Sequence, residues 1–231
     1  MPQQKILAQG AEAIIYLEES RELINSNAEG VCGWEGTGSE RDSKKLIIVK
    51  DRIAKSYRIP ELDSKIRKSR TKAEAKLLDK VSKIIPAPQP EEIPKAGRII
   101  RMPFIDGQKL SDHLDSFPLT KQKQILKQIG KNIAKIHEAG IIHGDLTTSN
   151  MILVENQVFL IDFGLGYQNG KYEDKAVDIH LLKQALEAKH FKHWEATYKE
   201  FESGYSSINK TESKKVFERL KAVEKRGRYK H

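Results

Sequence analysis

Cysteine is almost absent from this chain, whose only cysteine is Cys32. A single cysteine excludes an internal disulfide, and no group of cysteines and histidines has the spacing of a metal site. No apolar run approaches the ~18–20 residues of a transmembrane helix, and the N-terminus lacks the basic-then-apolar pattern of a signal peptide. We therefore expect a soluble protein in a reducing, cytoplasmic setting, with no membrane partner.

The composition indicates a basic protein with a modest apolar core. The 231 residues carry a formal net charge of +9, with 32% charged and 38% hydrophobic residues. This length suffices for one large domain or for two small lobes that share a cleft. The charge favours a polyanionic partner, with nucleic acid as the first candidate, although a merely soluble basic protein has the same balance.

Two polar motifs, separated by a predicted hairpin, are the strongest functional signal. The motif HGDLTTSN contains Asp145 and Asn150, and IDFGLG contains Asp162. Between them, the apolar segments 151–154 and 158–161 predict two short strands. Phosphoryl transfer needs one carboxylate to orient a nucleophile, and a carboxamide and a second carboxylate to hold Mg²⁺ on a triphosphate. The order predicts Asp145 as the catalytic residue and Asn150 and Asp162 as metal ligands. An ordinary hairpin with incidental acidic residues is the alternative.

The N-terminal segment predicts a strand, a turn of small residues and a second strand. Such a turn can place backbone N–H groups over phosphates. Because it contains a single glycine, the glycine-rich pattern is only partly met, and a plain hairpin fits equally well. The candidate nucleotide-binding residues in this turn are Gln9, Gly10, Ala11, Glu12 and Ala13.

Residues 18–45 are polar and glycine-rich, which predicts a flexible insertion. An apolar strand follows and ends at Lys50, the candidate phosphate anchor. The apolar spacing then predicts a helix over 71–85 that ends before a proline. Glu74 lies in its first turns and is the predicted ion-pair partner of Lys50, whereas a solvated surface glutamate is the alternative.

Lysine and arginine are concentrated before this helix and at the C-terminus. Such clusters permit contacts with a phosphate backbone or an acidic partner, although a solvated face can carry them too. We expect the terminus to be a frayed or extended tail that reaches a partner, so truncation after Glu224 should weaken binding. The candidate partner-binding residues are Arg67, Lys68, Arg70, Arg226, Arg228 and Lys230.

A short strand over 98–101 leads into residues 102–107, which we interpret as a hinge between two lobes. Adenine would hydrogen-bond the backbone there, near Met102 and Phe104.

A helix capped by Thr120 and closed by Gly140 is predicted to lead directly into His143. Asp178 is predicted to open the next helix and, with His143, to support the catalytic loop; a simple helix N-terminal carboxylate is the alternative. Two further helices are predicted over 191–203 and 211–225.

The motifs together resemble a minimal protein kinase. More closely, the chain resembles the small atypical kinase/ATPase subunit of the KEOPS (EKC) complex, which supports threonylcarbamoyladenosine formation on tRNA. The resemblance covers nearly the whole chain, and the compact size is similar to stand-alone, archaeal-type members. It rests on QGAEAIIY, KSYRIPELD, RKSRTKAEAKLL, HGDLTTSN, IDFGLG, YEDKAVD and RGRYK.

This resemblance implies an α+β, minimal bilobal protein-kinase-like fold. Residues 1–101 would form a β-rich N-lobe with one main helix, 102–107 the hinge, 108–225 a reduced, mainly helical C-lobe, and 226–231 a basic tail. ATP and Mg²⁺ are the implied cofactors. The implied partners are the threonylcarbamoyl-transferase subunit, a small regulatory subunit on the N-lobe side, and tRNA, bound directly or through the complex. The implied activities are ATP hydrolysis in the complex and serine/threonine autophosphorylation in isolation.

Several departures from ordinary kinases help to choose among the possible functions of the chain. Gly144 stands where many kinases have an arginine that receives an activation-loop phosphate, and no Ala-Pro-Glu closes the short segment after Asp162. A nucleotide hydrolase or switch therefore fits better than a free-standing serine/threonine kinase with a peptide platform. A small-molecule phosphotransferase would need a larger C-terminal lobe. A non-catalytic scaffold would not need Lys50, Asp145, Asn150 and Asp162 together.

Overall fold

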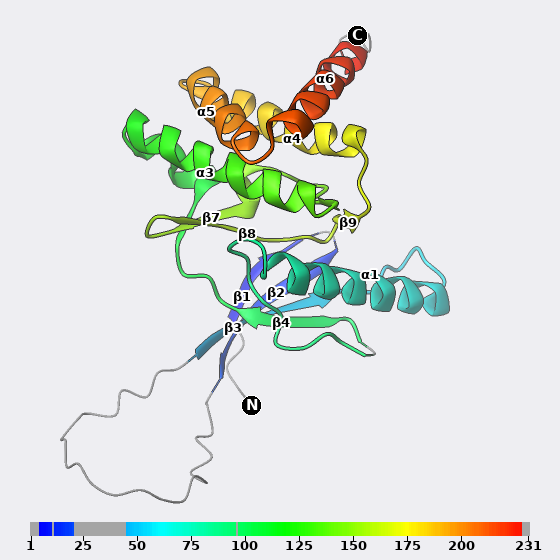
Figure 1. Cartoon of the computed structure of the whole chain (residues 1–231). Coiled ribbons are helices and arrows are strands. Elements are labelled where there is room, and N and C mark those ends of the chain that lie inside the picture. Colours follow the sequence, from blue (N-terminus) through cyan, green and yellow to red (C-terminus); the bar gives the residue numbers. More distant parts are fainter. Residues whose placement is uncertain (1–4, 11, 21–44, 96, 228–231) are drawn as a thin grey trace, which may run out of the picture.

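The computed structural model describes residues 5–10, 12–20, 45–95 and 97–227. It has an antiparallel sheet and one long helix in its N-terminal part and a helical C-terminal part (Figure 1). The predicted α+β, kinase-like fold class is thereby confirmed.

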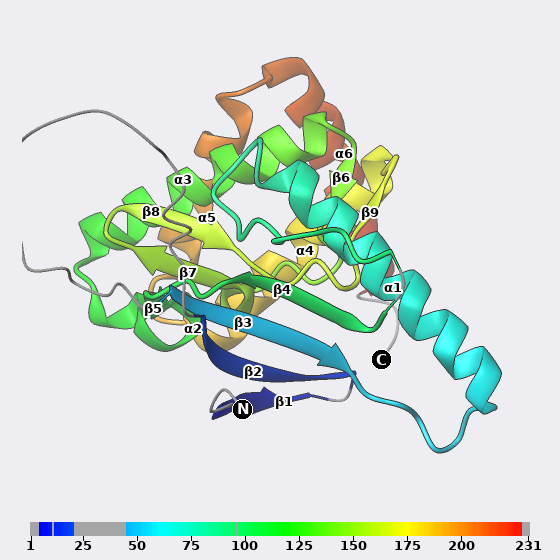
Figure 2. The ribbon, with the colours of Figure 1, turned by 90° about the horizontal axis from the view of Figure 1, so that it is seen from below.

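The N-lobe sheet holds Lys50 near its centre. Its four strands are hydrogen-bonded in the order β1-β2-β3-β4 (Figure 2). The register pairs Lys50 of β3 with Ile15 of β2 on one side and with Ile100 of β4 on the other. The bounds are β1 Lys5–Gln9, β2 Ala13–Ser20, β3 Lys45–Arg52 and β4 Ile99–Pro103. The predicted insertion was thus too long at both ends: β2 continues to Ser20, β3 begins at Lys45, and 21–44 lie outside the described residues.

Helix α1 spans Pro60–Val81, so the prediction of 71–85 was wrong at both ends. Proline is compatible with the first helical position because an N–H there would have no intrahelical acceptor. Glu61 and Asp63 in the first turn complement the helix dipole. The first turns carry mostly charged residues, and the continuous apolar stripe begins only near Ala75. Sequence periodicity therefore detected only the C-terminal part of the helix.

The C-lobe has a helical body and three short strand pairs. The predicted hairpin is confirmed as β7 Met151–Val154 and β8 Gln157–Leu160. The segment after the Asp-Phe-Gly motif is tied to the start of the predicted catalytic loop, residues 143–150, because β6 and β9 pair. The other bounds are β5 Gln108–Lys109, β6 Ile141–Ile142, β9 Tyr167–Gln168, α2 Leu110–His113, α3 Leu119–Glu138, α4 Tyr172–Lys189, α5 Trp194–Ser206 and α6 Lys210–Gly227, with 3₁₀ turns η1 Leu114–Ser116 and η2 Thr148–Asn150.

Several predicted boundaries in this lobe were wrong, including those of the helix predicted over 191–203, which is α5 at Trp194–Ser206. Thr120 lies inside the first turn of α3, whose N-cap is Pro118, because a proline can precede a helix without a side-chain cap. Asp178 lies in the second turn of α4, which begins at Tyr172. The first two residues of the expected tail belong to α6, and 228–231 lie outside the described residues.

One apolar core runs through both lobes and includes residues of α1, the β7–β8 hairpin and all the long C-lobe helices. The apolar face of α3 is completely buried at Ile129, Ile133 and Ile136. Helix α5 approaches α3 closely, since a Cβ on Gly204 would lie 2.1 Å from the carbonyl oxygen of Lys127. Among the described residues, no helix is both long and apolar enough to cross a bilayer.

Candidate active site

A cavity of about 380 Å³ lies between the N-lobe sheet and the β7–β8 hairpin. Its walls are mostly apolar, with a small group of polar residues, which is the usual make-up of a small-molecule site. The apolar lining includes Ile15, Ile48, Met102, Phe104, Ile152 and Ile161, and the polar lining includes Lys50, Glu74, Asn150 and Asp162. The structure therefore brings the hinge, the anchor and both predicted metal ligands together around one cavity.

One backbone hydrogen-bonding group of the predicted hinge already has a partner within the protein. The backbone N–H of Phe104 donates a hydrogen bond to the carbonyl oxygen of Leu46 at 3.0 Å. Phe104 can therefore offer a base its carbonyl oxygen or its ring, and the apolar walls suit a flat aromatic ligand.

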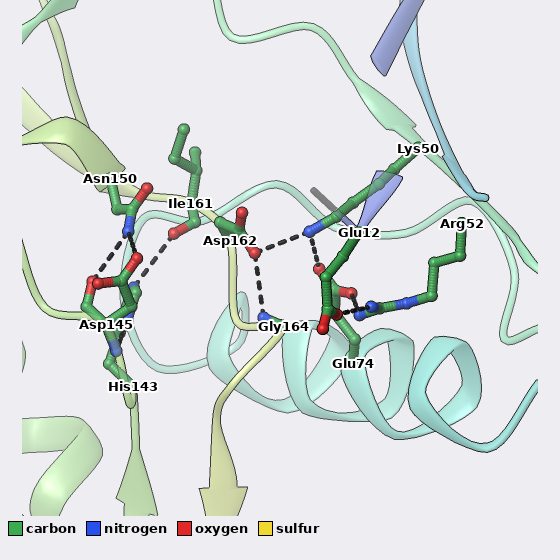
Figure 3. Close-up of polar contacts among 10 residues, drawn as sticks. All are labelled: Glu12, Lys50, Arg52, Glu74, His143, Asp145, Asn150, Ile161, Asp162 and Gly164. Atoms are coloured by element: carbon green, nitrogen blue, oxygen red, sulfur yellow. Dashed lines mark hydrogen bonds and ion pairs between the residues drawn. The ribbon is translucent and has the colours of Figure 1, made fainter. Parts of the chain in front are cut away.

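Lys50 lies between two carboxylates (Figure 3). Its Nζ is 2.7 Å from Oε1 of Glu74 and 2.7 Å from Oδ1 of Asp162. The predicted Lys50–Glu74 pair is thus confirmed. Burial alone would lower the pKa of Lys50, but the two carboxylates raise it above its ordinary value. Lys50 is consequently a fixed positive charge at the polar end of the cavity.

Asp162 adopts a left-handed backbone conformation, with φ of 59°. Aspartate tolerates this region better than most residues, and the conformation turns its carboxylate toward Lys50. Oδ1 also accepts a hydrogen bond from the backbone N–H of Gly164 at 3.1 Å. Burial would raise the pKa of Asp162, but Lys50 and this hydrogen bond keep it below its usual value. The side chain is 45% exposed, so its ionised carboxylate can reach a bound cation.

Asn150 is oriented by Asp145, five residues earlier. Its amide nitrogen donates to the carbonyl oxygen of Asp145 at 2.8 Å and to the carboxylate oxygen Oδ2 at 2.9 Å. The amide oxygen of Asn150 is then the atom left to bind a cation. Together with the Asp162 carboxylate, it supplies the hard oxygen donors that Mg²⁺ prefers, so the residues fit this ion. Asp145 is exposed to solvent and accessible to a substrate.

The catalytic loop is held from below by Asp178. Its carboxylate accepts hydrogen bonds from the backbone N–H groups of His143, at 2.7 Å, and Gly144, at 2.8 Å. The predicted contact between Asp178 and the backbone of this loop is thereby confirmed. The His143 ring bonds the carbonyl oxygen of Ile161 at 3.1 Å through Nε2, and it packs on Phe163. His143 thus links the catalytic loop to the Asp-Phe-Gly motif.

Gly144 leaves no room for a side chain. Its φ is 82°, and a Cβ would lie 2.4 Å from the carbonyl oxygen of Leu165. The segment after Asp162 therefore packs directly on the position where many kinases have an arginine.

The small-residue turn lies beside the cavity rather than in its wall. Gly10 donates its N–H to the carbonyl oxygen of Ala13 at 3.0 Å, which closes a tight turn. Among the described residues, the lining comes from Leu7 and Ala8 of β1 and not from the predicted Gln9, Gly10, Glu12 and Ala13. The predicted Ala11 lies outside the described residues.

Of the four predicted partner-binding cations that the structure describes, three are paired within the protein. Arg67 pairs with Asp63 at 2.6 Å, Arg70 with Glu12 at 2.6 Å, and Arg226 with Glu173 at 2.7 Å. Lys68 is exposed on α1. Arg228 and Lys230 fall outside the part of the chain that the structure describes.

Sequence reasoning missed Arg52. Its side chain is only 4% exposed, and it contacts Glu74 at 2.6 Å and Glu12 at 2.9 Å. Alternation along β3 places Arg52 on the same face as Lys50, two residues earlier, and this spacing was the available signal. Three apolar residues that line the cavity were also missed, namely Ile15, Ile48 and Ile152. An apolar residue in a strand is usually interpreted as part of the core, so the sequence gives no signal that it lines a cavity.

The fold and the site define a protein of the kinase-like class. Residues 41–176 match the model of the RIO domain. The chain is 40% identical over 227 residues to "KEOPS complex subunit Bud32" of Pyrococcus abyssi, which covers 97% of this chain and 96% of that protein. It is 37% identical over 194 residues to "Probable serine/threonine-protein kinase BUD32 homolog" of Archaeoglobus fulgidus, covering 83% of this chain and 94% of that one. This chain belongs to the RIO-domain family, within its Bud32 group.

A longer relative shows the same region fused to other sequence. The "Probable bifunctional tRNA threonylcarbamoyladenosine biosynthesis protein" of Methanosarcina mazei is 36% identical over 230 residues. The match covers 99% of this chain but only 36% of that protein.

Proposed function

We propose that this chain is a Mg²⁺- and ATP-dependent atypical kinase/ATPase that acts as the Bud32-type subunit of a KEOPS complex, in threonylcarbamoyladenosine modification of tRNA. The single observation that carries the proposal is the position of Lys50 between Glu74 and Asp162, at the polar end of a cavity that Asn150 also lines. The names of the relatives support the assignment to the complex.

Each polar residue has a role in this proposal. Lys50 binds the phosphates of ATP, and Glu74 holds Lys50 in place. Asp145 orients the attacking hydroxyl group or water, and its position near Asn150 keeps it beside the transferred phosphoryl group. Asn150 and Asp162 hold Mg²⁺, which when bound neutralises charge on the phosphates.

The short segment after Asp162 favours ATP hydrolysis over general protein phosphorylation. It is held in the β6–β9 pair and packs against Gly144, so it cannot offer the long platform on which kinases bind peptides. Serine/threonine phosphorylation is the second candidate, because one relative is named as a kinase of this type.

The decisive experiment measures ATP turnover by the purified chain, alone and with the transferase subunit and tRNA. We expect turnover to depend on Mg²⁺ and to rise when partner and tRNA are added, without phosphate on either. Radiolabel on the partner, with no effect of tRNA, would instead support protein phosphorylation. A chain that neither binds nor hydrolyses ATP would contradict the proposal.

We also propose that the complex includes the transferase subunit and a small regulatory subunit, that it works in the cytoplasm, and that tRNA contacts the basic tail. Because Arg67, Arg70 and Arg226 are paired internally, Lys68 and the tail residues Arg228 and Lys230 are the better candidates for phosphate contacts. Truncation after Gly227 removes Arg228 and Lys230 but keeps α6, which includes the first two residues of the expected tail. It should weaken tRNA binding and reduce its salt dependence, whereas unchanged binding would exclude the tail.

A further inference from the structure

A series of alternating charges extends from the cavity to Arg70 of α1, and Figure 3 shows its part from Lys50 to Glu12. Lys50 contacts one carboxylate oxygen of Glu74, and Arg52 contacts the other at 2.6 Å. The second nitrogen of the Arg52 guanidinium donates to Glu12 at 2.9 Å. Arg70 of α1 then donates to the remaining oxygen of Glu12 at 2.6 Å. The loop between β1 and β2 is in this way linked to the Lys50–Glu74 pair.

Arg52 contacts both Glu12 and Glu74, so it joins the loop between β1 and β2 to the Lys50–Glu74 pair. Its side chain is buried beside Glu74, which is 1% exposed, whereas Glu12 is 46% exposed. A planar guanidinium can hold two carboxylates at once in a fixed geometry, and the compact ammonium of lysine cannot reproduce this. A Cβ added to Gly164 would lie 3.4 Å from the same guanidinium, so Arg52 also abuts the Asp-Phe-Gly motif.

The loop between β1 and β2 carries a negative charge that Arg52 and Arg70 neutralise. Loops that bind phosphates ordinarily use several glycines, whereas this one contains Gly10 alone and carries the acidic Glu12. The hydrogen bond from Arg70 keeps the pKa of Glu12 below its usual value, so its carboxylate stays ionised. An ionised carboxylate near a triphosphate would repel it unless cations neutralise the charge. Arg52 and Arg70 supply that neutralisation and also order the loop.

We propose that Arg52 is a positioning residue that holds the loop between β1 and β2 and the Lys50–Glu74 pair in one arrangement, with Arg70 fixing Glu12 from α1. This inference rests on the nucleotide site of the proposed function. Arg52 does not line the cavity, so it acts through Glu12 and Glu74 rather than by touching the nucleotide. We call Arg52, Glu12 and Arg70 the loop clamp.

The test compares conservative and disruptive variants of the loop clamp. Arg52→Lys should keep the buried contact with Glu74 and lose Glu12, so it should behave like Glu12→Gln. For both, we expect the KM for ATP to rise about tenfold with kcat within about twofold, as loss of a charged hydrogen bond implies. Arg52→Met loses both contacts, so KM should rise and kcat should also fall by about tenfold or more.

Two further variants complete the set. Arg70→Gln should raise KM in the same direction as Glu12→Gln but by less, because it breaks one of the two ion pairs of Glu12. Combining the two substitutions should be no worse than Glu12→Gln alone, because that substitution already removes the contact with Arg70. The matched control is Arg98→Gln. Arg98 is an exposed arginine paired with Asp51 on the neighbouring strand at 2.7 Å, and its loss should leave KM and kcat unchanged.

Hydrogen exchange without nucleotide provides a readout that is independent of activity. The amide of Gly10 donates to the carbonyl oxygen of Ala13, and the amide of Ile53 donates to the carbonyl oxygen of Glu12. Both amides should therefore exchange faster in the Glu12→Gln and Arg70→Gln variants. Unchanged exchange and KM in these variants would overturn the loop clamp, as would an Arg52→Met variant that only melts at a lower temperature. If the wild type bound no ATP, the proposed function would fail together with the positioning role, while exchange would still show whether the clamp orders the loop.

Discussion

An oxygen of the buried Asp178 carboxylate lies 2.7 Å from the backbone nitrogen of His143, so helix α4 directly supports the start of the catalytic loop. The same oxygen lies 3.3 Å from Nε2 of His137 on α3, and the other ring nitrogen of His137 bonds the hydroxyl of Tyr205 on α5 at 2.9 Å. Three helices of the C-lobe therefore contribute to the position of one loop.

Replacing Asp178 by alanine should destabilise the protein and abolish turnover. The substitution leaves the N–H groups of His143 and Gly144 without their acceptor, and each such buried donor costs about 1–3 kcal/mol. Asp178→Asn retains one acceptor oxygen and should be intermediate. Urea unfolding and ATP turnover measure the two effects, and an alanine variant with normal stability and turnover would refute the supporting role.

Asp145→Asn should lose turnover but not ATP binding. The side chain is exposed and its polar contact is with Asn150, so the fold does not depend on its charge. Loss of a group that orients the nucleophile should reduce kcat about 100-fold or more, with an unchanged melting temperature. Asp112→Asn is the control, since Asp112 is an exposed aspartate that pairs with Lys189 and does not line the cavity. Retained hydrolysis in Asp145→Asn would exclude the assigned role.

Stability should fall as the pH drops from 7.5 to 5.5. Burial lowers the pKa of both His137 and His143 below the usual value, so each stays neutral in the folded state while the unfolded chain takes up a proton near pH 6.5. Below that pH, each histidine can remove up to about 1.4 kcal/mol of stability per pH unit, until its folded pKa is reached.

Urea midpoints at pH 5.5 and 7.5 test this expectation, because carboxylates with lowered pKa values, such as Asp162, titrate below this range. His137→Gln should reduce the pH dependence by removing one of the two groups. A wild-type protein whose stability does not change over this range would contradict the account.

Gly204→Ala should destabilise the protein by separating α5 from α3. The added methyl group would lie 2.1 Å from the carbonyl oxygen of Lys127, which belongs to the backbone and cannot move independently of its helix. Overpacking of this kind costs about 1–3 kcal/mol. Ser203→Ala, at the exposed position before it, should be neutral in the same thermal unfolding assay; equal midpoints for the two variants would disprove the close contact.

The proximity of the predicted catalytic residue and metal ligands could be inferred from the sequence, because these residues lie close together along the chain. Asp145 and Asn150 share one short loop, and the β7–β8 hairpin leads straight to Asp162. In these two cases, local geometry brings the residues together with little dependence on the remainder of the fold. The Lys50–Glu74 pair is a tertiary contact, and it was predicted because the downstream motifs favoured a kinase-like site over a solvated surface glutamate.

The charged network around α1 could not be predicted in this way. Arg67 and Arg70 read as surface cations, because their partners Asp63 and Glu12 are identified only when the helix is known to begin at Pro60 and to pass the β1–β2 loop. Arg52 depends on three elements at once. The contacts of Arg52 and Arg70 are tertiary and have no periodic signature in the sequence. The Arg67–Asp63 pair does have the i,i+4 spacing of a helix, and it was missed because the helix was predicted to begin only at residue 71.

The pairing of β6 with β9 has a pharmacological consequence. Ile142 pairs with Tyr167, and the intervening Phe163 is fully buried against His143. A compound that needs this phenylalanine to swing outward would have to break the strand pair and empty part of the core. Selective inhibitors of this protein should therefore be sought among compounds that bind the apolar end of the cavity, beside Met102 and Phe104.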